Sequence, residues 1–297
     1  MSDSGSPFDG STDPRSLDPD PRPSEVDAGV GGAGSNLAAG SDLATGSTDE
    51  GDFPSPVPGG RTFTDSRTVR LSDTWTNGRL RLDALGRYLQ DVAGDDVDDA
   101  GLQDTVWVVR RTAVRIGGRP RIGERVVLTT FCSALGTRWA ERRTTITGPS
   151  SRIEASALWV HVDPSSGRPA PLTHDLVAAY GAVTAGRRVS TRFVVPLPDA
   201  SATRRRPWPL RATDYDVLGH VNNAVYWAMA DDGEDDGEDG GEDGGEDGSA
   251  TVEHRVPIEP HTEVELVESA DRRLRWLIGP LGVHAACRVG WVPGGAR

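Results

Sequence analysis

The chain is built from two copies of one unit. Residues 72–85, SDTWTNGRLRLDAL, align without a gap on residues 213–226, TDYDVLGHVNNAVY. Further along, IGERVVL at 122–128 matches PHTEVEL at 260–266, and an Arg-Trp pair follows each of these matches. A length of 297 residues is enough for two ordinary domains. The repeat therefore predicts two halves of similar structure.

Each unit begins with a short polar turn that leads into a helix and then into several strands. In the first copy, Leu82, Leu85, Leu89 and Val92 recur at helical spacing, which predicts a helix with one apolar face. Strands are predicted at 107–116, 124–135, 138–148 and 154–171. A long helix followed by antiparallel strands is an α+β unit in which the sheet wraps around the helix.

Composition separates a tail from the two halves. Residues 1–60 are rich in Ser, Gly, Pro and Asp and poor in large apolar side chains, which predicts a disordered acidic tail. A short helix and a linker at 174–188 separate the copies. The halves are therefore residues 61–187 and 188–297, with TRFVVPL at 191–197 opening the second.

The net charge of −13 is unevenly distributed. The tail holds 11 acids and two Arg, and the tract Asp231–Asp247 holds 11 acids and no base, so the rest of the chain carries +7. All basic residues are Arg. A positive body suits an acidic partner such as a carrier protein or a nucleotide-containing thioester, and no nucleic-acid partner is expected.

The acidic tract is a repeat that interrupts the second copy. From Gly233 it runs GEDD and then GEDG with a period of four. The start of a calcium-binding loop is nearly satisfied, but the twelfth position is Asp243 instead of Glu and no helix follows. Such high charge with so much Gly predicts a disordered insertion over about 233–250. We expect the second helix to continue to near Asp236 before this loop begins.

No metal, cofactor or membrane span is predicted. The chain has no leader-like apolar segment and no window approaching the roughly 18 apolar residues that a span needs, which favours a soluble, cytoplasmic protein. Cys132 and Cys287 lie far apart without a partner motif, so each is expected to be a small buried residue. The six His residues show no metal-ligand spacing.

Four stretches resemble the conserved sequences of one enzyme family: NGRLRLDALGRYLQDVA, WVVRRTAVRI, TTFCSALGTRWAERRT and DYDVLGHVNNAVYW. They are similar to acyl-acyl carrier protein thioesterases, the double-hotdog branch of the thioesterase superfamily. The resemblance covers residues 61–230 well and 251–297 loosely. It implies a tandem double hotdog, each half a long helix wrapped by an antiparallel sheet, that hydrolyses acyl-acyl carrier protein to a free fatty acid without a cofactor. Because two hotdog units already form a pseudo-dimer, the chain is expected to be a monomer or a homodimer.

Only the second copy keeps residues suited to catalysis. It has Asp216, His220, Asn222 and Asn223 where the first has Trp75, Arg79, Arg81 and Leu82. Thioester hydrolysis needs a group that attacks or activates water, and donors that hold the charge developing on the carbonyl oxygen. Asp216 suits the first role, as general base or as nucleophile. His220 suits the orientation of the water or the polarisation of the carbonyl.

The start of the second helix supplies further candidates. Its first free N–H groups, over 221–223, are predicted to form an oxyanion site. Asn222 or Asn223 is expected to cap the helix, to position Asp216 or to contact the substrate. Val221 and Tyr226 are predicted to contact the substrate. Large aromatic residues are expected in the core, with some of them lining an acyl tunnel: Trp107, Trp139, Trp159, Tyr226 and Trp227.

The chain departs from the family at two points. Plant members carry Asn, with a catalytic role, where this chain has Leu218. The task of positioning water then passes to Asn222, Asn223 or His220. Plant members also place an acid beside a Cys after the first strand that follows the helix. Here VEHRVPIEPHTEVEL offers Glu253 and Glu259 without a Cys, and we favour Glu259.

Two other functions are compatible with the sequence. The HVNN turn is shared across hotdog hydrolases, so an acyl-CoA thioesterase is the closest rival. A noncatalytic acyl-binding or regulatory protein is the rival of another class, motivated by Leu218 and by the interrupted second helix.

Overall fold

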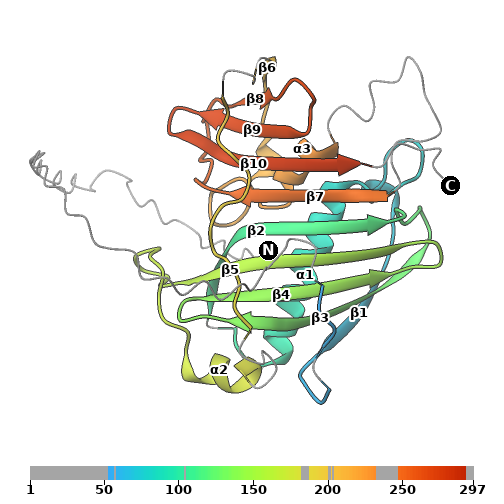
Figure 1. The fold of residues 1–297 in the computed structure, drawn as a ribbon, viewed down its shortest axis with the longest axis vertical. Coiled ribbons are helices and arrows are strands. Elements are labelled where there is room, and N and C mark those ends of the chain that lie inside the picture. Colours follow the sequence, from blue (N-terminus) through green and yellow to red (C-terminus); the bar gives the residue numbers. More distant parts are fainter. Residues whose placement is uncertain are drawn as a thin grey trace, which may run out of the picture. The chain divides into compact units, whose positions relative to one another are not determined.

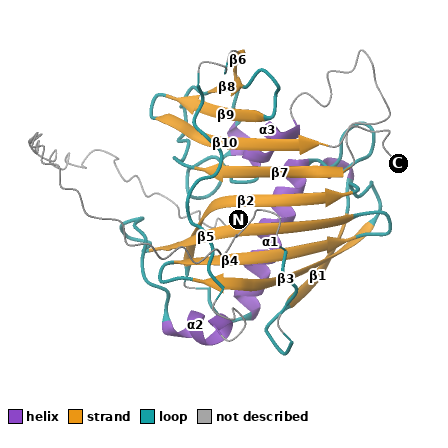
Figure 2. Cartoon of the chain, in the orientation of Figure 1, coloured by secondary structure: helices purple, strands orange, loops and turns teal. Residues whose placement is uncertain are grey.

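One antiparallel sheet runs through the computed structural model, with helices packed on one of its faces (Figure 1). The structure describes residues 53–56, 58–103, 105–181, 187–199, 202, 204–231 and 247–291. Figure 2 shows the long helix α1 and the short helix α3 on the same side of the sheet. No helix in these ranges is long and apolar enough to cross a membrane.

The two halves contain the same series of elements. The first comprises β1 (Phe63–Thr68), α1 (Leu82–Asp99), β2 (Val106–Gly117), β3 (Arg125–Leu135), β4 (Trp139–Thr147) and β5 (Arg152–Val162). After α2 (His174–Tyr180), the second comprises β6 (Arg204–Pro207), α3 (Ala228–Asp231), β7 (Asp247–His254), β8 (Glu265–Glu268), β9 (Leu274–Gly279) and β10 (Gly282–Trp291). The first-half helix and strands predicted from the sequence are confirmed, except that the segment predicted at 154–171 is a strand only as far as Val162.

The order of the strands makes the duplication visible. The ten strands of the described chain are arranged β1-β3-β4-β5-β2-β7-β10-β9-β8-β6. If β6 is matched with β1, and β7 to β10 with β2 to β5, each half has the same order and the halves meet at β2 and β7. These two strands pair antiparallel, with Arg111 opposite Glu253 and Gly117 opposite Asp247. The α+β class is confirmed, since the pairings are antiparallel and the helices cover one face.

Helix α1 lies over the core because its apolar residues recur every three to four positions. Leu82, Leu85, Leu89 and Val92 are each at most 8% exposed. They join a core that continues through β2, β3 and the second half. Gly86 brings α1 close to the second half, because a Cβ there would lie 2.7 Å from the Trp227 ring and 3.2 Å from the Ala224 Cα.

The second helix is described only in part. A single 3-10 turn, Val225–Trp227, leads into α3, which is followed as far as Asp231. The predicted continuation to Asp236 and most of the acidic insertion lie outside the described residues. Strand β7 already begins at Asp247, so residues 247–250, which the sequence placed in the insertion, belong to the sheet. All four pair with β2, and residues 248–250 also pair with β10.

The segment that joins the halves, residues 187–199, crosses the sheet face opposite α1 (Figure 1). Glu253 on that face accepts hydrogen bonds from the N–H groups of Val194 and Val195. Trp276 donates its indole N–H to Pro196 O at 2.8 Å. The stretch TRFVVPL is therefore a strap held by side chains, and the first strand of the second half is β6. Pro196 in this stretch and Pro198 directly after it lack the N–H that a strand ladder needs.

Part of the predicted N-terminal tail also contacts the sheet. The ring of Phe53 lies 4.9 Å from the guanidinium carbons of both Arg115 and Arg143. Such cation–π contacts stabilise the placement of the ring. Residues 1–52, the greater part of the tail that we predicted to be disordered, lie outside the described residues.

A buried carboxylate links the two halves on the helix side of the sheet. Asp231, at the end of α3, accepts a hydrogen bond from Leu82 N–H, the first residue of α1, at 2.5 Å. Its other oxygen lies 2.8 Å from Arg119, and both side chains are at most 3% exposed. Burial raises the pKa of Asp231, and the charge of Arg119 opposes that shift. Because α1 has no side-chain cap of its own at Arg81, this carboxylate from the other half takes that place.

Replacing Asp231 by Ala should destabilise the protein severely. The variant breaks the buried ion pair with Arg119 and removes the acceptor at the start of α1, which together cost about 3–5 kcal/mol. Urea unfolding of the variant and the wild type measures the difference in free energy. Asp175, which is 87% exposed on its side chain, provides the control, and Asp175→Ala should shift stability by under about 0.5 kcal/mol. Equal stability of the two variants would contradict this role for Asp231.

Candidate active site

The duplicated turn has the same backbone hydrogen bonds in both halves. In the first, Trp75 N–H donates to Arg79 O at 2.9 Å, and Gly78 N–H donates to Trp75 O. The second repeats this pattern, with Asp216 N–H to His220 O at 2.9 Å and Gly219 N–H to Asp216 O at 3.0 Å. Gly78 and Gly219 have φ of 78° and 76°, a left-handed conformation that favours glycine. The turn is thus held by main-chain bonds, which leaves its side chains free to differ between the copies.

Asn222 caps the second turn and Asn223 does not. The Oδ1 atom of Asn222 accepts a hydrogen bond from Ala224 N–H at 2.9 Å, which is a typical capping contact. The structure therefore separates two neighbouring residues whose roles were left open on the sequence. Asn223 takes the position of Leu82 in the first half.

Two of the three N–H groups that were predicted to form an oxyanion site already donate to backbone carbonyls, so the prediction is wrong for these two. Val221 N–H donates to Ile258 O at 3.0 Å, and Asn222 N–H donates to Asp214 O at 2.8 Å. Both are used by the fold and cannot receive an oxyanion. Asn223 N–H has no hydrogen-bond partner among the described residues.

Asp216 and His220 lie on the partly exposed side of this turn. The Asp216 Oδ1 atom accepts from Leu218 N–H at 2.9 Å, whereas its Oδ2 atom has no partner among the described residues. The His220 ring likewise makes no hydrogen bond within the described part of the chain. The Leu218 side chain points outward and is 69% exposed. The turn therefore presents one free carboxylate oxygen and one free imidazole.

The structure distinguishes the two candidate glutamates. Glu253 is fully buried and is occupied by the strap and by Arg255, at 2.7 Å, on the face away from α1. Glu259 is exposed and follows Ile258, the residue whose carbonyl binds Val221. Glu259 is thus the acid whose backbone adjoins the turn.

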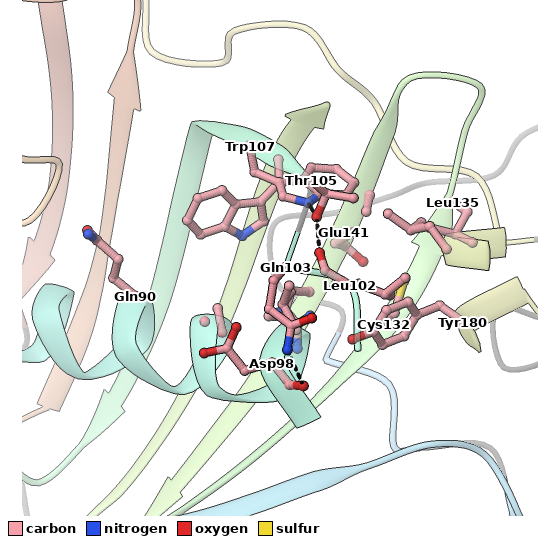
Figure 3. Close-up of a pocket in the computed structure, with 17 residues that line it drawn as sticks. Gln90, Asp98, Leu102, Gln103, Thr105, Trp107, Cys132, Leu135, Glu141 and Tyr180 are labelled. Atoms are coloured by element: carbon pink, nitrogen blue, oxygen red, sulfur yellow. Dashed lines mark hydrogen bonds between the residues drawn. The ribbon is translucent and has the colours of Figure 1, made fainter. Parts of the chain in front are cut away.

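A large apolar cavity opens at the far end of α1 (Figure 3). Its volume is about 330 Å³, within the range of ligand pockets in proteins. Figure 3 shows Trp107, Leu102, Cys132 and Leu135 around this space, between α1, the strands and α2. Burial raises the pKa of Cys132 to about 12, so the thiol is neutral and forms part of the apolar wall. Tyr180 closes the α2 side.

A small cavity lies beside this pocket, where α1 meets the second half. It holds about 30 Å³ and is bordered by Asn223, Trp227 and His254 from the second half and by Gly86 and Leu89 of α1. Both cavities share three lining residues: Gln90, Arg142 and Trp159. The two cavities are therefore neighbours beside α1, and Asn223 borders the smaller of them.

Two predicted substrate contacts are core residues. Val221 and Tyr226 are each 3% exposed and belong to the main apolar core. Neither lines the large or the small cavity. Burial raises the pKa of the Tyr226 hydroxyl well above its ordinary value, and the nearby Asp216 charge adds to the effect. Tyr226 is therefore a neutral part of the support behind the turn.

Several cavity-lining residues were not predicted from the sequence, and His254 is the most polar of those from the second half. No motif surrounds it. Strand alternation in VEHRV would have placed it on the same face as Val252, but not beside a cavity. Within the described ranges, no group of three or more His, Cys, Asp or Glu side chains is arranged to hold a metal ion.

Comparison with known proteins decides the family. A family model described as the acyl-ACP thioesterase N-terminal domain matches residues 60–180. Two uncharacterized proteins of Mycobacterium tuberculosis, from strains CDC 1551 / Oshkosh and H37Rv, are each 32% identical over 171 residues, covering 57% of this chain and 68% of theirs. The chain belongs to the acyl-ACP thioesterase family.

Solved acyl-ACP thioesterases have the same fold. The 12:0-ACP thioesterase from Umbellularia californica matches with a TM-score of 0.63 and 18% identity, over 78% of this chain and 97% of that one. An acyl-ACP thioesterase from Bacteroides thetaiotaomicron matches with a TM-score of 0.61 and 13% identity, over 78% and 98% of the two chains. At these identities the likeness establishes the hotdog-type fold alone.

The two asparagines of this acyl-ACP thioesterase turn should differ in their effect on stability. Asn222→Ala removes the acceptor for Ala224 N–H and should cost about 1 kcal/mol of unfolding free energy. Asn223→Ala removes no hydrogen bond seen in the described structure and should cost under about 0.5 kcal/mol. Urea unfolding of both variants measures the difference, each serving as the control for the other. A larger loss of unfolding free energy for Asn223→Ala than for Asn222→Ala would contradict the assignment of the cap to Asn222.

Proposed function

We propose that the protein hydrolyses the thioester of acyl-acyl carrier protein to a free fatty acid and the carrier-protein thiol. The observation that carries this proposal is the apolar cavity beside α1, which is able to hold an acyl chain and neighbours the small cavity that Asn223 borders. Family membership supports the same reaction. An acyl-CoA thioesterase shares this chemistry and differs only in the leaving group.

The proposed architecture is a tandem double hotdog. It is supported by the matching order of strands on either side of the β2–β7 contact. The first half supplies the large cavity, and the second half supplies the turn with Asp216 and His220. Because both halves are in one chain, a monomer already contains the complete site; a homodimer and a cytoplasmic location stay predictions.

In the proposed mechanism, Asp216 acts through its free Oδ2 atom. As general base it takes a proton from a water molecule, whose oxygen adds to the thioester carbonyl carbon. The C–S bond then breaks, the carboxylic acid forms, and the proton passes to the leaving sulfur. As nucleophile, Asp216 would form an anhydride that water then cleaves. His220 and Glu259 are the residues that we propose to orient that water, and Asn223 N–H, which has no partner among the described residues, is the proposed main-chain donor.

A positive surface near the turn favours an acidic carrier protein. Strand β6 is RRRP, and all four of its residues are exposed at the edge of the sheet. Arg211, 78% exposed on its side chain, follows and binds Asp214 beside the turn. Such charge raises the rate of encounter with an acidic protein, and its effect weakens with salt.

Loss of the Asp216 carboxylate should abolish most turnover. Asp216→Asn keeps the acceptor for Leu218 N–H, so the turn is preserved, while the group that activates water is lost. We expect kcat to fall about 10²–10⁴-fold. Release of free thiol is measured with dodecanoyl-acyl carrier protein and dodecanoyl-CoA, using wild type, Asp216→Asn and Asp216→Ala.

Each outcome of this assay has a distinct meaning. A higher kcat/KM for the carrier-protein substrate supports the proposal, and a higher value for the CoA substrate favours the rival thioesterase. Wild type without turnover on either would leave a noncatalytic acyl-binding protein. Equal rates in wild type and Asp216→Asn would remove Asp216 from the mechanism.

Narrowing the large cavity should shift the preference to shorter acyl chains. Gly94 of α1 lines this cavity, and a Cβ built there meets no atom within 4 Å. The Gly94→Leu side chain should displace methylenes of long substrates, which reduces kcat/KM about fourfold for each displaced methylene. The assay compares octanoyl and hexadecanoyl carrier protein. Gly94→Ala is the control, because it gains helix propensity without filling the space, and an unchanged preference in Gly94→Leu would show that the acyl chain lies elsewhere.

A further inference from the structure

Two buried ring nitrogens on the wall of the small cavity have no hydrogen-bond partner. They are Nδ1 of His254 and Nε1 of Trp159. A buried polar atom without a partner costs about 1–3 kcal/mol. Such atoms are uncommon in folded proteins, and a place in a functional site is one reason for keeping them.

The sheet register places these two rings in one row. Val109 on β2 pairs with Trp159 on β5. On the other side of β2, Arg111 pairs with Glu253, the residue before His254. The two rings therefore flank the same short stretch of β2, where a bulge falls between Val109 and Arg111. Both rings line the small cavity beside α1.

The His254 ring packs against the ring of Tyr226, another residue of the second half. Its centroid lies 5.0 Å from that of Tyr226, with the planes at 87°, an edge-to-face contact. Tyr226 follows the duplicated turn along the chain, and Asn223 of that turn borders the same cavity.

His254 is suited to donate a hydrogen bond as a neutral imidazole. Burial lowers its pKa to about 4, so the ring carries no charge near neutral pH. A neutral imidazole still has one N–H donor. In an enclosed apolar site, a donor aimed at a carbonyl oxygen stabilises the negative charge that develops there during hydrolysis.

We propose that the small cavity holds the thioester group of the substrate and that His254 donates a hydrogen bond through Nδ1 to its carbonyl oxygen. The acyl chain then continues past Trp159, which lines both cavities, into the large one. This inference rests on the proposed function. It makes His254 a catalytic residue outside the duplicated turn.

His254→Phe tests the proposal because it keeps a ring against Tyr226 and removes the donor. With dodecanoyl-acyl carrier protein, kcat should fall about 10²–10³-fold, with little change in KM. His254→Gln restores an N–H donor and should recover at least about tenfold of that loss. The thermal midpoint of His254→Phe should equal or exceed that of the wild type, because an unpartnered buried polar atom has been removed. His174→Phe, at a His whose side chain is 94% exposed on α2, should keep the wild-type kcat.

The results that overturn the inference are separable from those that overturn the proposed function. If the wild type is active and His254→Phe has the same kcat, His254 has no catalytic role, but the proposed function is unaffected. Lower kcat together with a lower thermal midpoint and no recovery in His254→Gln would assign His254 to structure alone. A wild type without turnover on carrier-protein or CoA thioesters sinks both.

Discussion

The contact of Asp231 with the start of α1 is the interaction on which the helical layer depends. The Asp231 carboxylate accepts from Leu82 N–H of the other half and from Arg119, so a buried negative charge lies at the N-terminal end of α1, where the helix dipole favours it. Arg275 donates to the last carbonyls of the short helix, those of Met229 and Ala230. The first residue of the acidic tract is therefore a structural part of the fold, whatever the rest of the tract does.

The duplicated turn explains how one half kept the candidate chemistry while the other lost it. Its shape comes from main-chain hydrogen bonds and from glycines at positive φ in both halves. Side chains in the turn were consequently free to diverge. Leu82 became part of the core at the start of α1, whereas its counterpart Asn223 borders a cavity. In the proposed function, the first half supplies the binding volume and the second half supplies the catalytic groups, so the site needs both halves.

The wall of the small cavity contains polar atoms that lower stability and that the proposed function would use. A core built for stability alone would place apolar groups at the positions of Trp159 and His254, since both keep a buried nitrogen without a partner. Polar donors beside an apolar channel are the arrangement that a substrate with one polar bond and a long hydrocarbon chain requires. The carrier-protein thioester proposed for this site has that composition.

Much of this architecture could be predicted from the sequence, because it depends on residues close together along the chain. The apolar spacing of α1, the first-half strands and the repeated turn are local patterns, and so is the family resemblance they carry. The TRFVVPL segment was less predictable, because the side chains that hold it as a strap come from distant strands. Adjacent Asn222 and Asn223 have identical chemistry, so only backbone geometry assigned the cap to the first. His254 and the small cavity lie where β7 pairs with β2 beneath α1, and such contacts between distant segments are decided by tertiary structure alone.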